Sequence, residues 1–394
     1  MLRITLLVLS FTAVALAGCG GGGGGIGGTQ VPAPVTAQPA NAGGGTTGVT
    51  AGQAALVWSQ PAGLAVNTWH WTATNPSGSV MVATTIPGDL YVSRDNGASW
   101  TAQSGLPANA MWISADLSDD GQVIVAVALN GGMYRTRDGG ATWSRIDSAF
   151  NATENLDYES VSLSADGTHI VAVVIGGATS GGAIWASTDG TADAPTFAAA
   201  TMAGGGALAS WWRAVDSDAS GTRVVAASHN GDAWVSNDSG ATFAPLPITV
   251  GGTAVQDGWY RLALSRDGTT LAIAGNEEYA AGVAAGQRSS GLYVGRFDAA
   301  NWTFARGSDV KGNYTRIAIA ANAPVIAATL SGANGGALVS SNNGASFAPL
   351  STPAGETTWR SIAITGDASH AVLAAGTFFA TPGNLYVSSG PLAP

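Results

Sequence analysis

A short turn motif recurs four times along the chain, and it is the feature that most constrains the fold. Its template is Ser/Thr-x-Asp/Asn-x-Gly-x-Ser/Thr-aromatic, and a short apolar run precedes every copy. An Asp or Asn at this spacing is expected to bond the backbone two residues on, the Gly accepts a positive φ, and the ring covers the turn. The motif therefore predicts tight strand-turn-strand corners. These four box turns are Ser93–Trp100, Thr136–Trp143, Ser236–Phe243 and Ser340–Phe347.

We interpret the side chains of the box turns as structural rather than catalytic, because each has a role in holding its own corner. The template resembles the Asp-box, also called the BNR repeat, of sialidase-like β-propellers. Four good matches in one chain make that resemblance specific. The structural box residues are Asp95, Gly97, Trp100, Asp138, Gly140, Trp143, Asp238, Gly240, Phe243, Asn342, Gly344 and Phe347.

A second repeated turn gives the number of units. It is a Ser/Asp/Gly turn before an apolar run, and it recurs at Gly78, Gly121, Gly167, Gly221 and Gly268, with Ala323 and Ala368 as degenerate equivalents. Periods of this size point to propellers or solenoids. The chain has only 13 Trp and 8 Tyr in 394 residues, yet an aromatic stands nine positions before every anchor. These seven aromatics are Trp69, Trp112, Tyr158, Trp212, Trp259, Tyr314 and Trp359.

Each unit is predicted to hold four short strands, with a box turn between the third and fourth. The units at 158 and 259 lack a good box, and the seventh ends after three strands. Residues 55–61 resemble a fourth strand and precede the first unit, so we expect them to close the ring. The predicted fold is an all-β, seven-bladed propeller over residues 54–394, whose last blade is completed by the N-terminal strand. The repeat also resembles those of sortilin-like and photosystem II assembly-factor-like propellers.

The first 53 residues are predicted to export and tether the propeller. Residues 1–19 carry one basic residue, an apolar run too short to span a membrane, and Leu-Ala-Gly-Cys, which resembles a bacterial lipobox with Cys19 as the lipidated residue. An ordinary signal peptide with an incidental Cys is the alternative. Residues 20–53 are rich in Gly, Pro, Ala and Thr and read as a flexible linker. Because Gly rather than Asp follows Cys19, the resemblance implies the outer membrane in a Gram-negative cell.

Composition limits the partners. Only 10% of the residues are charged, the net charge is −10, and Cys19 is the only cysteine, so the exported fold has no disulfide. An acidic chain with so few cations argues against nucleic acid as a partner. No His or Cys spacing suggests a metal, and we expect no cofactor. We expect a monomer.

Unusual residues gather where the inner strands begin, on the face opposite the box turns. Long loops containing Glu277, Glu278, Tyr279, Phe378 and Phe379 are expected to overhang the same face. Arginine binds carboxylates and phosphates, and rings stack on sugars or side chains, so this face is the candidate ligand-binding surface. The candidate residues are His70, Trp71, Glu159, Trp211, Arg213, Tyr260, Arg261, Arg316 and Arg360.

Two interpretations of this face stay open. In one, the seven periodic aromatics are core between blades. In the other, the arginines and the aromatics outside the repeat register form the rim of a ligand pocket at the axis. The candidate arginines either bind a ligand at the axis or are structural.

The sequence leaves two hypotheses about function, because this fold supports many activities. The leading hypothesis is a non-catalytic cell-envelope lipoprotein that binds or scaffolds a protein segment or an acidic glycan. The alternative is a carbohydrate-active enzyme, a sialidase-like glycoside hydrolase or lyase. That resemblance calls for three arginines, a Tyr nucleophile with a Glu partner, and an Asp acid/base. The chain lacks the Arg-Ile-Pro expected near the first blade, and it has only five Glu.

Overall fold

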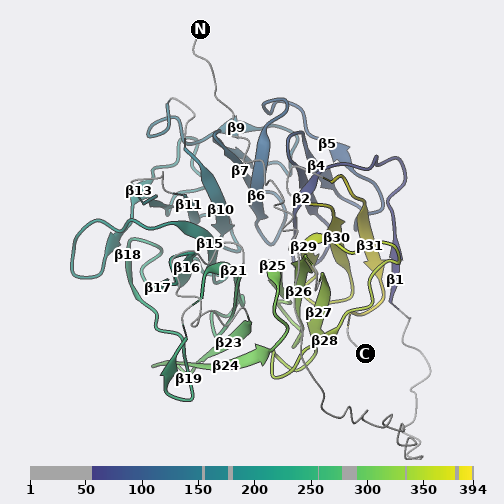
Figure 1. Ribbon diagram of the computed structural model, residues 1–394. Coiled ribbons are helices and arrows are strands. Elements are labelled where there is room, and N and C mark those ends of the chain that lie inside the picture. The colour runs from purple at the N-terminus through teal and green to yellow at the C-terminus, as the bar shows by residue number, and fades with distance from the viewer. Residues whose placement is uncertain are drawn as a thin grey trace, which may run out of the picture. The chain divides into compact units, whose positions relative to one another are not determined.

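The computed structural model describes residues 56–152, 156–175, 181–255, 257–276, 291–332, 335–377 and 381–392. Within these ranges every regular element is a β-strand, and seven sheets of four main strands surround one axis (Figure 1). The chain is a seven-bladed β-propeller, as the repeat predicts. No described helix is long and apolar enough to cross a membrane.

The blades repeat one antiparallel meander from the axis outward. The innermost strands are β2 (Trp69–Thr74), β6 (Met111–Leu117), β10 (Tyr158–Leu163), β15 (Trp212–Ser217), β21 (Trp259–Leu264), β25 (Asn313–Ile319) and β29 (Trp359–Ile364). The second strands are β3 (Met81–Thr85), β7 (Ile124–Leu129), β11 (Ile170–Val174), β16 (Val224–Ser228), β22 (Thr270–Gly275), β26 (Ile326–Ser331) and β30 (Ala371–Ala375).

Together, the outer two strands are shorter than the inner two in every blade except the one that begins with β21. The third strands are β4 (Leu90–Ser93), β8 (Met133–Thr136), β12 (Ile184–Ser187), β17 (Ala233–Ser236), β23 (Leu292–Phe297), β27 (Gly336–Ser340) and β31 (Leu385–Ser389). The fourth strands are β5 (Thr101–Ala102), β9 (Ser144–Arg145), β13 (Ala198–Ala199), β18 (Thr242–Pro245), β24 (Trp302–Ser308), β28 (Ala348–Pro349) and β1 (Val57–Ser59). Blades 1 to 7 are numbered by the order of their inner strands.

The ring closes as predicted. Strand β1 pairs antiparallel with β31, with Val57 opposite Ser389 and Ser59 opposite Val387, so the start of the propeller supplies the last strand of blade 7. Three short strands were not predicted. The first, β14 (Thr201–Met202), pairs parallel with β18, while β19 (Thr249–Val250) and β20 (Thr253–Ala254) form a separate hairpin.

The core consists of seven apolar clusters, one between each pair of neighbouring blades. Each cluster contains one of the seven periodic aromatics, and none of these rings is more than 2% exposed. The seven aromatics are therefore core between blades. Second strands are buried on both faces, which explains why they are rich in Ala and Val: a neighbouring blade packs against each face.

The two ends of the axis differ. We call the end where inner strands begin the aromatic face, and the end that carries the box turns the box face. In the first box turn, Asp95 accepts hydrogen bonds from Ser93 Oγ at 2.8 Å and from the Ser99 backbone N–H at 2.9 Å. The sequence argument placed that backbone bond two residues on, but it spans four. These local bonds lower the pKa of the Asp95 carboxyl. The same pattern recurs at Asp138, Asp238 and Asn342.

Blade 3 contains a fifth turn of this kind that its sequence obscures. Asp189 accepts a bond from Ser187 Oγ at 2.8 Å, as in a box turn. Its backbone partner is Thr196, seven residues on, with an N–O distance of 2.8 Å. An insertion inside the turn therefore lengthens the spacing without changing the bonding.

Replacing Gly344 by Ala is expected to reduce the free energy of unfolding by about 2–4 kcal/mol. Gly344 has a φ of +83°, and an added Cβ would lie 2.7 Å from Val294 Cγ2 of the preceding blade. Gly204 is the matched control, because its φ is +94° but nothing lies within 4 Å of an added Cβ. Urea unfolding of Gly204→Ala should show only the backbone strain, about 1 kcal/mol. Equal losses would contradict the packing of box glycines between blades.

Candidate functional site at the propeller axis

A β-bulge follows the periodic aromatic in every inner strand. The pairing with the second strand shifts by one residue at the same place in all seven blades. A bulge leaves one residue unpaired and re-aims its side chain. The seven bulged residues are His70, Ile113, Glu159, Arg213, Tyr260, Thr315 and Arg360.

Glu159 forms a buried ionic cluster with two of the candidate arginines. Its Oε1 lies 3.4 Å from Arg213 Nη1 and 3.7 Å from Arg261 Nη1, and its side chain is only 6% exposed. Arg261 also donates to the Thr315 carbonyl at 2.9 Å, and its guanidinium lies 4.0 Å from the ring centroid of Tyr260. The structure therefore brings together residues from blades 3, 4 and 5.

Arg213 and one further arginine, Arg360, bond to neutral imidazoles. Arg213 Nε donates to His229 Nδ1, and Arg360 Nε donates to His70 Nδ1, each at 3.1 Å. Burial, reinforced by the neighbouring guanidinium, lowers the pKa of His229 to about 4 and that of His70 well below its usual value. The ring of Trp211 meets His229 edge to face, 4.8 Å away.

Acidification is expected to destabilise the propeller through His229. The unfolded imidazole takes up a proton near pH 6.5, about the ordinary value. The folded one does so only near pH 4, so its stabilising effect is lost as pH falls through this window. Because buried carboxyls titrate in the opposite sense, a variant isolates the effect. His229→Gln keeps a bonding partner for Arg213. On going from about pH 7 to about pH 5, the free energy of unfolding of this variant should fall by about 1–2 kcal/mol less than that of the natural sequence. Urea unfolding at both pH values measures this, and equal losses would contradict it.

The aromatic-face cluster carries an excess of positive charge. Arg316 belongs to the other end of the axis, and of the other eight candidate residues three are arginines and Glu159 is the one carboxylate. His70, Trp71, Glu159, Tyr260 and Arg261 are buried, whereas Trp211, Arg213, Arg316 and Arg360 keep part of their surface. Buried cations without matching anions are costly. The cluster is therefore suited to receive an anionic group.

Trp71 lies against arginines on the axis. Its Nε1 donates to the Ala115 carbonyl of blade 2 at 2.7 Å, which fixes the ring across two blades. The guanidinium of Arg316 lies 3.6 Å from a ring centroid of Trp71, and that of Arg261 lies 5.7 Å away. Burial lowers the pKa of Arg316 to about 10. Arg316, unlike the other candidate arginines, lines a cavity that belongs to the inner-strand ends at the box face.

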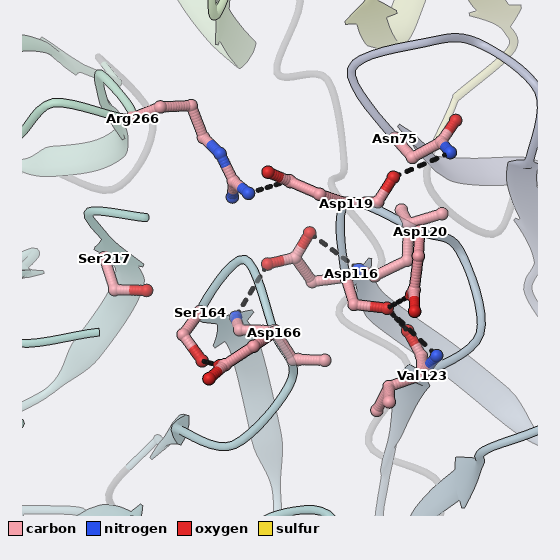
Figure 2. A network of polar contacts seen from close by, with 12 residues as sticks. Asn75, Asp116, Asp119, Asp120, Val123, Ser164, Asp166, Ser217 and Arg266 are labelled. Atoms are coloured by element: carbon pink, nitrogen blue, oxygen red, sulfur yellow. Dashed lines mark hydrogen bonds and ion pairs between the residues drawn. The ribbon is translucent and has the colours of Figure 1, made fainter. Parts of the chain in front are cut away.

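This axial cavity has a volume of about 130 Å³ and contains two aspartates, both partly buried. Asp116 accepts from the Leu163 N–H of blade 3, and Asp216 from the Leu264 N–H of blade 5, each at 2.8 Å. Burial raises the pKa of both carboxyls, that of Asp216 to about 6, where the charge of Asp116 adds to the effect. Asp116 thus joins β6 to β10 (Figure 2). Asp216 joins β15 to β21 in the same way.

An ion pair crosses the mouth of the cavity. Arg266 of blade 5 bonds the carboxylate of Asp119 of blade 2, and Figure 2 shows the two side chains meeting from opposite sides. Backbone bonds join the turns around this mouth. Asp119 N donates to Ala165 O, and Ala165 N donates to Ala219 O, both at 2.8 Å. The mouth is therefore bordered by a chain of blade-to-blade contacts.

Asp116, Asp119, Asp216 and Arg266 were not predicted from the sequence as candidate site residues. A signal existed for two of them. Asp116 and Asp216 stand four residues after the periodic aromatic, where the other blades have Ala or Ser. A buried position that alternates between Ala and Asp indicates a special role for the carboxylate.

Some expectations fall outside the residues that the structure describes. Cys19, Glu277, Glu278, Tyr279, Phe378 and Phe379 are among them. Within the described part, no group of three or more His, Cys, Asp or Glu side chains is placed to hold a metal ion.

No protein-family model and no curated protein matches the chain. Solved structures share its fold. The Myceliophteria thermophila Cps50 (Swd1) β-propeller domain is 10% identical with a TM-score of 0.60, covering 84% of this chain and 99% of its own. The GH74 enzyme of Niastella koreensis is 15% identical with a TM-score of 0.58. The match covers 84% of this chain and 44% of that enzyme. YCF48 bound to D1 peptide is 13% identical with a TM-score of 0.57, covering 85% and 96%. At these identities the likeness establishes the fold alone.

Proposed function

We propose that this propeller is a non-catalytic binding protein that holds an acidic protein segment at its aromatic face. The observation that carries the proposal is the excess of guanidinium groups around Glu159, in a protein whose net charge is −10. Carboxylates of a partner would offset this buried positive charge, and Arg presents paired donors that match a carboxylate. Trp211 keeps part of its surface and supplies a flat apolar ring for the segment, while the buried ring of Tyr260 packs against Arg213 and Arg261.

The similar structure of YCF48 with D1 peptide supports a peptide as the partner, because a propeller of the same fold binds one there. An acidic glycan satisfies the same charges, and the experiment below distinguishes the two. We further propose an Asp-box lipoprotein, exported by residues 1–19, lipidated at Cys19 and tethered by residues 20–53. In a Gram-negative cell, Gly20 after Cys19 supports the outer membrane as its location.

A carbohydrate-active enzyme is the second candidate, and one observation favours it. Asp116 and Asp216 lie in one cavity, and the pKa of Asp216 is raised to about 6, as a catalytic acid requires. However, both carboxylates accept backbone N–H groups of neighbouring strands, and the cavity of about 130 Å³ is smaller than a typical ligand pocket. Their structural role explains them better than catalysis.

Binding of labelled peptides tests the proposal. A Glu-rich peptide is expected to bind the purified protein, and a Gln-matched peptide to bind about tenfold to a hundredfold more weakly. Arg213→Gln and Arg360→Gln should each weaken the Glu peptide by a similar factor, while Arg94→Gln, an exposed change on the box face, should not. Fluorescence anisotropy measures affinity, and thermal unfolding confirms that each variant folds.

Several outcomes would contradict this assignment. Equal binding of the Gln peptide would show that charge is not recognised. An equal effect of Arg94→Gln would show that the binding is not at the aromatic face. Binding of a polyuronate but not of the Glu peptide would make an acidic glycan the ligand instead. Release of reducing sugar from that polyuronate, lost in Asp216→Asn, would favour the enzyme.

A further inference from the structure

The axial cavity at the box face contains a partly buried cation, Arg316, whose hydrogen-bond donors have no partner among the residues that the structure describes. Arg316 lines the cavity, and its guanidinium makes no hydrogen bond or ion pair to any residue that the structure describes. Its Nε is fully covered. The contact that holds it is the ring of Trp71, at 3.6 Å. A buried donor without an acceptor is costly, so this group calls for an acceptor inside the cavity.

The opposite charge lies in the same cavity but not in contact with Arg316. Asp116 and Asp216 each accept backbone hydrogen bonds from two N–H groups, and Asp216 also accepts one from Ser162 Oγ at 3.1 Å. No described carboxylate lies within 4.0 Å of the Arg316 guanidinium. A carboxylate has about four acceptor positions, so both aspartates keep room for further donors. The cavity thus presents free donors from Arg316 and free acceptors from two carboxylates.

The empty volume comes from one position of the repeat. Four residues after the periodic aromatic, blades 2 and 4 carry Asp116 and Asp216, while four other blades carry Ala. All four alanines line the cavity together with Ile and Val side chains. The substitution of Ala for a larger side chain leaves the space open. These four alanines are Ala73, Ala263, Ala318 and Ala363.

We propose that the axial cavity binds a small α-amino acid as its zwitterion, of about the size of glycine or alanine. The ligand's carboxylate bonds the Arg316 guanidinium, and its ammonium group lies between Asp116 and Asp216. A zwitterion adds no net charge, and it satisfies both sets of unused groups at once. The alanine-lined walls limit the ligand's side chain to a methyl group. The proposal does not depend on the function assigned to the aromatic face.

The ligand must pass the ion pair between Arg266 and Asp119. Both side chains are partly exposed, 25% and 44%, and they come from blades 5 and 2, so separating them needs no change within either blade. An exposed pair of this kind contributes little to stability and opens readily.

Calorimetric titration of the purified protein tests the proposal with defined probes. Glycine and L-alanine are expected to bind, whereas acetate and methylammonium should bind at least about tenfold more weakly, since each satisfies only one set of groups. L-Leucine should not bind, because its side chain exceeds the space. Ala318→Leu, which fills the cavity without altering a charge, should abolish glycine binding.

Each alternative result is decisive. Acetate binding as tightly as glycine would make this an anion site, and methylammonium binding as tightly would make it a cation site; either overturns the proposal. Absence of heat with every probe would mean that water alone fills the cavity, and it overturns the proposal as well. Arg316→Gln and Asp216→Asn should both lose glycine binding, and circular dichroism separates that loss from misfolding. Glycine binding that survives Ala318→Leu would place the ligand elsewhere.

Discussion

Deletion of residues 54–62 is expected to remove most of the propeller's stability. Strand β1 would be lost, and with it the pairing of Val57–Ser59 to β31 and the bond from Trp58 Nε1 to the Ser351 carbonyl at 2.8 Å. A few hydrogen bonds and the partly buried Trp58 together account for about 4–6 kcal/mol. Marginal stability means that such a loss approaches the total for many domains. Blade 7 would also expose an unpaired edge, which invites aggregation.

Chemical unfolding and size-exclusion chromatography measure this effect against a matched control. Deleting residues 20–50, a segment of greater length, should change the free energy of unfolding by less than about 1 kcal/mol. A synthetic peptide of residues 54–62 should restore part of the lost stability by adding a strand to β31. If the two deletions have equal effects, the ring does not depend on closure by β1.

Replacing Glu159 by Gln is expected to reduce the free energy of unfolding by about 3–5 kcal/mol. The carboxylate lies 3.4 Å from Arg213 and 3.7 Å from Arg261, and these guanidinium groups would remain buried without it. The same change should tighten binding of the Glu-rich peptide, because Glu159 competes for the arginines that the peptide uses. Lower stability with higher affinity is a combination that a general packing defect would not produce.

Two further variants sharpen this test. Glu356→Gln is the control, since Glu356 bonds the neutral groups of Asn384 and Tyr386 and an amide can replace it. In the double variant Glu159→Gln with Arg213→Gln, part of the lost stability should return, because one unmatched cation is removed. If Glu159→Gln is as stable as Glu356→Gln, the cluster is not the electrostatic centre that its geometry indicates.

The fold could be predicted from the sequence because the repeat consists of residues with strict structural roles, the core aromatics and the Asp and Gly residues of its turns. Each of the seven periodic aromatics lies in the apolar cluster between two neighbouring blades. The resemblance of residues 55–61 to a fourth strand predicted ring closure. The sequence indicated no good box in blade 3, because an insertion moves Thr196, the backbone partner of Asp189, along the chain.

The candidate site could be predicted only in part. Proximity to the periodic aromatic found Glu159, Arg213, Arg261 and Arg360, but it could not show that Glu159 pairs with Arg213 and Arg261 while Arg360 bonds to His70. Spacing along one strand says nothing about which groups meet across the axis. For that reason it also placed Arg316 on the aromatic face with the other arginines, whereas the side chain lines the cavity at the opposite end.

The bulge that follows each periodic aromatic allows the residue at that position to vary without changing the fold. The aromatic secures the blade, while the next residue can be His, Ile, Glu, Arg, Tyr or Thr with the same strand pairing. Seven such positions surround one axis, and each can be altered by a single codon change without remodelling a blade. Descendants of this chain could therefore acquire new ligands while their architecture stays fixed.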